Sequence, residues 1–229
     1  NCIAHRGFAG VNPENTLAAV RDAVGLGDGG DPSGSVARVD GVEVDIRRCG
    51  SGDLVVCHDE TVDRTTDGSG AVADYTAAEL AALSVERSES GVPTAAAVLE
   101  AVPANLVLHA ELKEQVGGEF EALVRDVDPD CEVVVSSFDA DALGEIESLP
   151  RAWLVFEADG AVERARELDC VALHPAADLC DETLVKRAHH AGLAVNAWTV
   201  TDPGETDRLR ALGVDGVITD FPECCPSRT

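Results

Sequence analysis

Residues 170–218 read CVALHPAADLCDETLVKRAHHAGLAVNAWTVTDPGETDRLRALGVDGVI, and their pattern already indicates an architecture. Three short apolar segments have the length of β-strands, namely Cys170–Leu173, Ala194–Thr199 and Gly216–Ile218. Two longer stretches between them have the composition of amphipathic helices, Asp181–Ala191 and Pro203–Leu212. Strands that alternate with helices at such regular spacing are typical of a parallel β/α architecture.

The same alternation extends back to the first residues. Five more strands are predicted at Cys2–His5, Val42–Ile46, Leu106–Glu111, Glu132–Ser136 and Trp153–Phe156. Five more helices are predicted at Asn15–Val24, Thr94–Ala101, Gly118–Val127, Ala140–Ile146 and Ala161–Leu168. We therefore predict an α/β protein, a (β/α)8 TIM barrel formed as one domain by residues 1–229, with a doubly wound sheet as the alternative. Polar residues at the C-terminal ends of several different strands favour the barrel.

Three segments interrupt this alternation of strands and helices. Gly25–Gly41 is rich in Gly and Asp and is predicted to be a flexible surface loop. Within Ile46–Cys57, the turn Gly50-Ser51-Gly52-Asp53 between apolar arms predicts a hairpin extension of the second strand. Asp59–Pro93 is too long for a plain connection, so residues 59–93 are expected to form a small inserted subdomain that caps one face of the barrel. The chain stops soon after the last strand, which leaves a full eighth helix doubtful.

Composition narrows the possible partners. The formal net charge of -26 and the pI of about 4.3 disfavour binding to nucleic acid and to anionic lipid, because both are bound by basic surfaces. A strongly acidic chain with only two Lys, Lys113 and Lys186, suggests a halophilic protein in a high-salt cytoplasm. No apolar run approaches the roughly 18 residues of a membrane span, so we expect a cytoplasmic protein without stable membrane association. The oligomeric state stays open.

The eight cysteines suggest a disulfide framework only at first sight. The chain is long, and it has neither a C-x-x-C pair nor His/Cys spacing suited to zinc. Cys224 and Cys225 are adjacent, which disfavours a bridge between them, and Cys57 and Cys170 lie in apolar strand-like runs. We expect the cysteines to be small buried side chains.

Carboxylates gather at two predicted strand ends. Glu43 and Asp45 stand at positions i and i+2 of one strand, so their side chains point to the same side. Glu111 ends another strand, and Lys113 follows at i+2 in a chain that nearly avoids Lys. Solvated acids and a surface ion pair would explain each pair taken alone. Together the three carboxylates suit a hard divalent cation, Mg²⁺ or Ca²⁺, and Lys113 suits a phosphate.

Two histidines end strands in a similar way. His5 ends the first strand and is followed by Arg6, and His58 ends the second arm of the hairpin. Imidazoles titrate near neutrality, so one can accept a proton while the other donates one. A lone histidine at a strand end is more often structural, and His109 and His174 remain weak candidates for that reason.

These residues fall into an ordered set of motifs that covers nearly the whole chain. The set is His5-Arg6-Gly7, Glu14-Asn15-Thr16, Glu43-x-Asp45, His58-Asp59-x-Thr61, Asp63-Arg64-Thr65-Thr66, Glu111-x-Lys113, Ser137-Phe138, Trp198-Thr199, and Asp215-Gly216 through Thr219-Asp220-x-Pro222. The set resembles the glycerophosphodiester phosphodiesterases. The resemblance implies a (β/α)8 barrel with an insertion after the second strand.

The resemblance also implies roles. Glu43, Asp45 and Glu111 match metal ligands, and His5 and His58 match the acid and base pair. Arg6 and Lys113 match phosphate contacts, Trp198 matches an aromatic pocket wall, and Glu14 and Asn15 match a motif that supports the loop after the first strand. The implied activity is hydrolysis of small-molecule glycerophosphodiesters to an alcohol and glycerol phosphate.

Two alternatives stay open: a phospholipase D-like lipid phosphodiesterase, and a metal-binding barrel without activity. The sequence does not decide which histidine is the acid. Because neither Ser136 nor Ser137 has a motif partner that would activate it, we expect the neighbouring glycerol hydroxyl to attack the phosphate.

Overall fold

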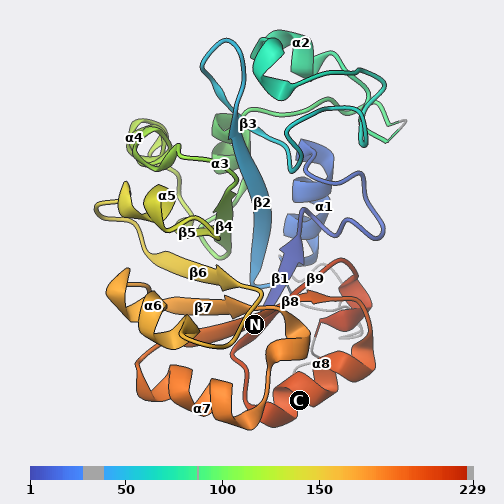
Figure 1. Ribbon diagram of the computed structural model, residues 1–229. Helices are drawn as coiled ribbons and strands as arrows, with labels where there is room; N and C mark the ends of the chain where they lie inside the picture. Colours follow the sequence, from blue (N-terminus) through green and yellow to red (C-terminus); the bar gives the residue numbers. More distant parts are fainter. Residues whose placement is uncertain (28–38, 87, 226–229) are drawn as a thin grey trace.

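A computed structural model describes residues 1–27, 39–86 and 88–225 (Figure 1). Eight parallel strands close into a barrel: β1 (Cys2–His5), β2 (Gly41–Arg48), β4 (Val107–Leu112), β5 (Glu132–Ser137), β6 (Arg151–Val155), β7 (Ala172–Pro175), β8 (Ala194–Val200) and β9 (Gly216–Thr219). Strand β1 pairs with both β2 and β9, and this closure confirms the barrel and excludes the doubly wound sheet.

Among the residues that the structure describes, seven helices cover the outside of the barrel: α1 (Leu17–Gly27), α3 (Ala95–Ala101), α4 (Gly117–Val127), α5 (Ala140–Gly144), α6 (Ala161–Glu167), α7 (Glu182–His190) and α8 (Pro203–Leu212). Helices α3, α5, α7 and α8 start with side-chain caps; Asp181, for example, accepts a hydrogen bond from the backbone N–H of Leu184. Within the described residues, only the short turn η3 (Pro222–Cys224) follows β9, as the sequence led us to expect.

The predicted hairpin is confirmed: β3 (Leu54–Val56) pairs antiparallel with the end of β2, with Ile46 opposite Val56. Residues 59–93 connect β3 to α3 and contain a short 3-10 turn, η1 (Val72–Asp74), and α2 (Ala77–Ala81). In Figure 1 this part lies at one end of the molecule, beside the tip of the hairpin. It has an apolar cluster of its own, formed with the hairpin by Cys49, Val55, Cys57, Val62, Val72, Leu80, Val85 and Val92.

The expected surface loop at Gly25–Gly41 falls largely outside the described residues, since the description stops at Gly27 and resumes at Val39. Its first three residues belong to the end of α1. None of the helices among the described residues is long and apolar enough to cross a bilayer.

The two weak histidine candidates lie inside the barrel. His109 and His174 are both buried, with their ring centroids 5.7 Å apart. Burial lowers the pKa of His109 to about 4, so this ring is neutral at physiological pH. The side-chain amide of Asn196 donates to Nε2 of His174 at 3.1 Å. Both rings therefore pack as neutral core groups.

The expectation for the cysteines was partly wrong. Cys2 of β1 and Cys225 after η3 form a disulfide, with their Cα atoms 5.2 Å apart. The other six cysteines are free, and five of them are buried, as expected. The bridge joins residues 223 positions apart, so no local spacing in the sequence could reveal it. Barrel closure brings the two ends of the chain together.

Candidate active site

Strand register brings the predicted site residues together at the C-terminal end of the barrel. His5 of β1 lies opposite Glu43 of β2, and Asp45 of β2 lies opposite Glu111 of β4. Residues in register on neighbouring strands point to the same face of a sheet, which here is the barrel interior. One carboxylate oxygen from each of the three acids lies within 4.8 Å of the others. The sequence could suggest this cluster but not its distances.

The three acids are buried, and the pKa of two of them is raised while that of the third is lowered. Burial, aided by the charge of Asp45, raises the pKa of Glu43 to about 8. Burial also raises the pKa of Glu111. For Asp45 burial acts in the same direction, but the charges of Arg6 and Lys113 outweigh it and lower its pKa. One oxygen of Glu43 and one of Asp45 are buried without a hydrogen-bond partner. Unpartnered carboxylate oxygens in a tight cluster are what a hard cation needs as ligands.

Two cations border the acid cluster. The ammonium of Lys113 lies 2.5 Å from Glu111 Oε1 and 3.6 Å from Asp45 Oδ1. The guanidinium of Arg6 lies 3.0 Å from Asp45 Oδ2, and the Arg6 backbone N–H donates to Glu43 at 3.0 Å. Both cations are mostly buried at the mouth, where they could also reach the oxygens of a bound phosphate.

His5 has a carboxylate partner that sequence reasoning did not assign. Its Nδ1 lies 2.6 Å from Asp220 Oδ1, and its Nε2 lies 3.8 Å from Glu43 Oε2. Burial would lower the pKa of His5, but the hydrogen bond with Asp220 and the charge of Glu43 outweigh it and raise that pKa. The motif Thr219-Asp220-x-Pro222 was visible in the sequence, yet only the barrel closure places it beside His5.

His58 is paired in a different way. Its Nδ1 lies 2.5 Å from Asp59 Oδ1, and the other oxygen of Asp59 accepts from Arg64 Nε at 2.5 Å. Burial lowers the pKa of His58 and dominates over the raising effects of Asp45 and Asp59. Asp59 therefore shares its negative charge between His58 and Arg64.

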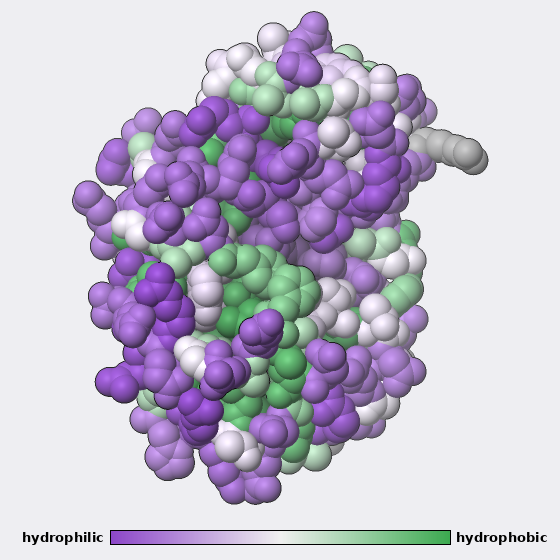
Figure 2. Space-filling view, viewed as in Figure 1, coloured by the Kyte–Doolittle hydropathy of each residue, from purple (hydrophilic) through white to green (hydrophobic). Residues whose placement is uncertain are grey.

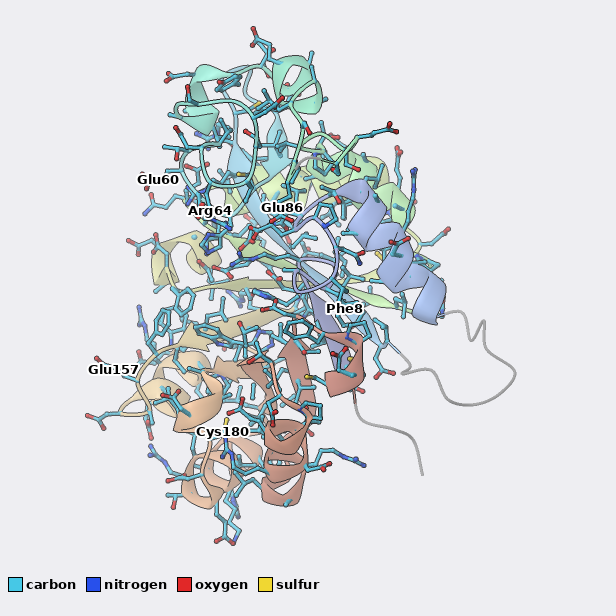
Figure 3. All side chains as sticks on the ribbon, turned by 90° about the vertical axis from the view of Figure 1, so that its right-hand side faces the viewer. Phe8, Glu60, Arg64, Glu86, Glu157 and Cys180 are labelled. Carbon is cyan, nitrogen blue, oxygen red and sulfur yellow. A yellow bond between two sulfur atoms is a disulfide. The ribbon has the colours of Figure 1, made fainter. Side chains whose placement is uncertain are left out.

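The Glu14-Asn15 motif links the insertion to the mouth. Glu14 accepts two hydrogen bonds from the Arg64 guanidinium, at 2.7 and 2.8 Å, and one from Arg6 at 3.1 Å. Asn15 donates to Asp45 Oδ2 at 2.7 Å. Figure 3 shows Arg64 where the insertion meets the barrel. These contacts agree with the supporting role expected for Glu14 and Asn15, whereas sequence alone did not reveal that Arg64 is a partner of Glu14.

Aromatic side chains form the other half of the mouth. The ring of Trp198 in β8 is nearly perpendicular to those of Phe138 and Phe156, with centroids 5.4 and 4.9 Å away. Phe138 follows β5, Phe156 follows β6, and their rings stack with centroids 4.6 Å apart. We call these three residues the aromatic ledge. Figure 2 shows a hydrophobic area below a hydrophilic hollow on this face of the molecule.

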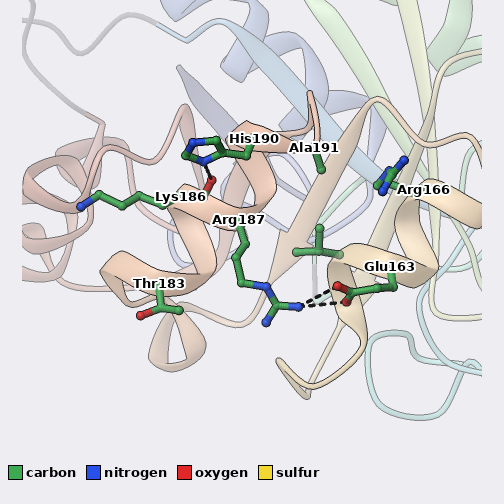
Figure 4. A pocket seen from close by; sticks show the side chains of 8 residues that line it. Glu163, Arg166, Thr183, Lys186, Arg187, His190 and Ala191 are labelled. Carbon is green, nitrogen blue, oxygen red and sulfur yellow. Dashed lines mark hydrogen bonds and ion pairs between the residues drawn. The ribbon is translucent and has the colours of Figure 1, made fainter.

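Away from the barrel mouth, a groove of about 520 Å³ lies on the outside of the barrel between α6 and α7 (Figure 4). Three of its four basic residues are engaged locally: Arg187 makes two contacts with Glu163, Lys186 pairs with Glu182, and His190 Nδ1 contacts the Lys186 carbonyl. Basic groups near the ends of helices α6 and α7 are explained by the helix dipoles. This groove contains none of the predicted site residues.

Comparisons with known proteins show the family of the chain. The sequence profile described as the glycerophosphoryl diester phosphodiesterase family matches residues 5–224. A glycerophosphodiester phosphodiesterase of Caldanaerobacter subterraneus subsp. tengcongensis is 32% identical over 240 residues, covering 96% of this chain and 94% of that protein.

Solved structures give the same result. A phosphodiesterase of Oleispira antarctica, in complex with the product sn-glycerol-3-phosphate, is 31% identical with a TM-score of 0.85, covering 97% of this chain and 94% of that one. A glycerophosphodiester phosphodiesterase of Thermotoga maritima is 27% identical with a TM-score of 0.78, covering 97% and 95%. The chain therefore belongs to the glycerophosphoryl diester phosphodiesterase family, whose members are phosphoric diester hydrolases.

Proposed function

We propose that this enzyme hydrolyses glycerophosphodiesters with the help of a divalent cation, Mg²⁺ or Ca²⁺, and uses His5 and His58 as its acid and base. The observation that carries the proposal is the convergence of three buried carboxylates, two cations and two carboxylate-paired histidines at one barrel mouth. The complex of the Oleispira antarctica relative with sn-glycerol-3-phosphate supports the same compound as the product here.

The residues present fit a hard cation. Glu43, Asp45 and Glu111 would hold it, because they supply oxygen ligands in a cluster whose mutual repulsion needs a positive charge. A bound divalent cation supplies Lewis-acid polarisation of a phosphoryl oxygen. Arg6 and Lys113 bring further positive charge to the phosphate and stabilise the charge that develops on its oxygens.

The two histidines contact different carboxylates, and this difference supports a choice of which one is the acid. Asp220 contacts His5 without sharing its charge with another described cation, so it favours the protonated imidazole. Asp59 is shared with Arg64, so it favours protonated His58 less strongly. We therefore assign His5 as the general acid and His58 as the general base.

The substrate supplies its own nucleophile. The hydroxyl of Ser137 donates to the Leu112 carbonyl at 2.8 Å and accepts from the Asp139 N–H at 3.0 Å, so it holds the backbone. His58 removes the proton of the glycerol hydroxyl next to the phosphate ester, and that oxygen attacks phosphorus. The bond from phosphorus to the alcohol breaks, and His5 gives its proton to the departing oxygen. Water then opens the cyclic phosphate while the two histidines exchange roles.

Removing the metal should abolish turnover. In excess EDTA, release of sn-glycerol 3-phosphate from a glycerophosphodiester should stop, and Mg²⁺ or Ca²⁺ should restore it. Glu111→Gln should weaken the restoration because it removes one charged ligand. Glu119→Gln, an exposed acid that pairs with Arg48, is the matched control and should behave as wild type. Full activity in EDTA, with metal content checked at zero, would falsify the metal requirement.

The two histidines should each contribute strongly to kcat. His5→Ala and His58→Ala should each lower kcat by about 10²–10⁴-fold, the usual scale for one acid or base. Asp220→Asn should shift the alkaline limb of the pH profile to lower pH, because losing that carboxylate lowers the pKa of the acid His5. His189→Ala, an exposed histidine on α7 paired with Asp215, is the control. Wild-type turnover in either active-site variant would refute its role.

The neighbouring hydroxyl should be indispensable. A glycerophosphodiester that lacks the 2-hydroxyl should be nearly inert, because an intramolecular nucleophile contributes up to about 7–11 kcal/mol through its orientation. Phosphorus NMR during turnover of the normal substrate should reveal a cyclic 1,2-phosphate, or the enzyme should hydrolyse that compound when it is supplied. Comparable cleavage of the deoxy analogue would mean that water attacks directly.

A further inference from the structure

One residue of the aromatic ledge is largely exposed, and the other two are partly buried. Phe156 has 65% of its surface accessible, although the chain has only eight aromatic residues, five Phe, two Trp and one Tyr. Three of the eight meet at one rim of the catalytic mouth. A single exposed ring would need no explanation, but Phe156 joins two other aromatic rings beside the acid cluster, and together they offer an apolar surface to a ligand.

A groove of about 350 Å³ adjoins the ledge. Aromatic rings line it on one side, namely Phe138, Trp153 and Phe156, and Glu157 and Asp159 lie on the segment that follows Phe156. No hydrogen bond or ion pair joins either carboxylate side chain to another residue in the described part of the chain. The cation in the groove, Arg164, pairs with Glu167 at 3.0 Å. The groove thus combines aromatic faces with unpaired negative charge.

The mouth as a whole has a charge polarity. Its cations Arg6, Arg64 and Lys113 lie on the side of β1, β2, β4 and the insertion. The aromatic side carries Glu157 and Asp159. Figure 3 shows Arg64 and Glu157 well separated on the same side of the molecule. A substrate with a negative phosphate and a positive charge on its leaving alcohol matches this polarity, whereas one with a neutral alcohol does not.

The two ends of such a substrate can reach both regions. Glu111 is in register with Ser136, two residues before Phe138, so the ledge begins on the strand next to the acid cluster. Neighbouring strands lie about 5 Å apart, which places Phe138 and Phe156 roughly one and two spacings from the strand that carries Glu111. A head group joined to the phosphate through two carbon atoms spans that interval.

We propose, on the basis of the proposed function, that the leaving alcohol of the preferred substrate carries a quaternary ammonium group of the choline type, held by the aromatic ledge with Glu157 and Asp159. Aromatic faces attract cations, and methylated ammonium groups lose little hydration when they contact a ring. The two carboxylates add attraction without requiring an N–H donor on the ligand.

The test compares two substrates with the same glycerophosphoryl part. The kcat/KM for release of sn-glycerol 3-phosphate is measured with glycerophosphocholine and with glycerophosphoglycerol, whose leaving alcohol is neutral. Wild type should favour the choline diester by about 10-fold, the scale of one good cation–π contact. Phe156→Leu keeps an apolar side chain but loses the ring. It should abolish the preference by lowering kcat/KM for the choline diester while leaving kcat/KM for glycerophosphoglycerol unchanged. Phe156→Tyr, which keeps a ring, should retain the preference.

The two acids beside the ledge are tested in the same assay. Glu157→Gln combined with Asp159→Asn should reduce kcat/KM several-fold for the choline diester only. Glu132→Gln, an exposed acid at the start of β5 and thus at the other end of the barrel, should change neither substrate. Equal turnover of both diesters by wild type, or an intact preference in Phe156→Leu, overturns the inference.

Two further outcomes also count against it. Should the ledge variants impair only lysophospholipids, the ledge holds an acyl chain and the choline assignment is wrong. If neither diester is hydrolysed, the proposed function itself fails, and this result is distinct from hydrolysis without preference.

Discussion

Mutual repulsion among Glu43, Asp45 and Glu111 is the constraint on which the site depends. Barrel register places Asp45 directly opposite Glu111, and the i, i+2 spacing adds Glu43 on the same side. Three negative charges in a buried cluster are unfavourable without compensation. Arg6 and Lys113 provide part of it, while burial, followed by the charge of Asp45, raises the pKa of Glu43 to about 8. The cluster thus retains a need for positive charge that a divalent cation can meet.

The surroundings of the cluster fix it in place through a second set of contacts. Glu14 joins Arg6 of the first loop to Arg64 of the insertion, and Arg64 in turn holds Asp59 beside His58. The guanidinium of Arg64 therefore connects the insertion to the barrel mouth. This connection also makes the two histidines unequal. Asp59 contacts both His58 and Arg64, whereas the one basic group that Asp220 contacts among the described residues is His5. A pair of chemically identical rings can then take opposite roles.

Much of this could be predicted from the sequence, for identifiable reasons. The strands in residues 170–218 were predicted within a few residues because apolar runs and amphipathic stretches alternate there without interruption. Glu43, Asp45 and Glu111 could be found because periodicity in strands fixes which side chains share a face. In contrast, the contact of Asp220 with His5 joins residues that are 215 positions apart in the sequence, and only the closed barrel brings them together. The contact of Arg64 with Glu14 spans 50 positions and depends on how the insertion folds. The disulfide between Cys2 and Cys225 was missed for the same reason.

The central claim, that the acid cluster is a cation site, can be measured without substrate. Because burial keeps Glu43 largely protonated near neutrality, a cation that binds the cluster must displace its proton. Calorimetric titration of Mg²⁺ or Ca²⁺ into metal-free enzyme, repeated in buffers of different ionisation enthalpy, reports the protons released. The account predicts a release close to one proton near pH 7 that disappears above about pH 9, together with tighter binding as the pH rises. Absence of binding, or binding with no proton release across this range, would contradict it.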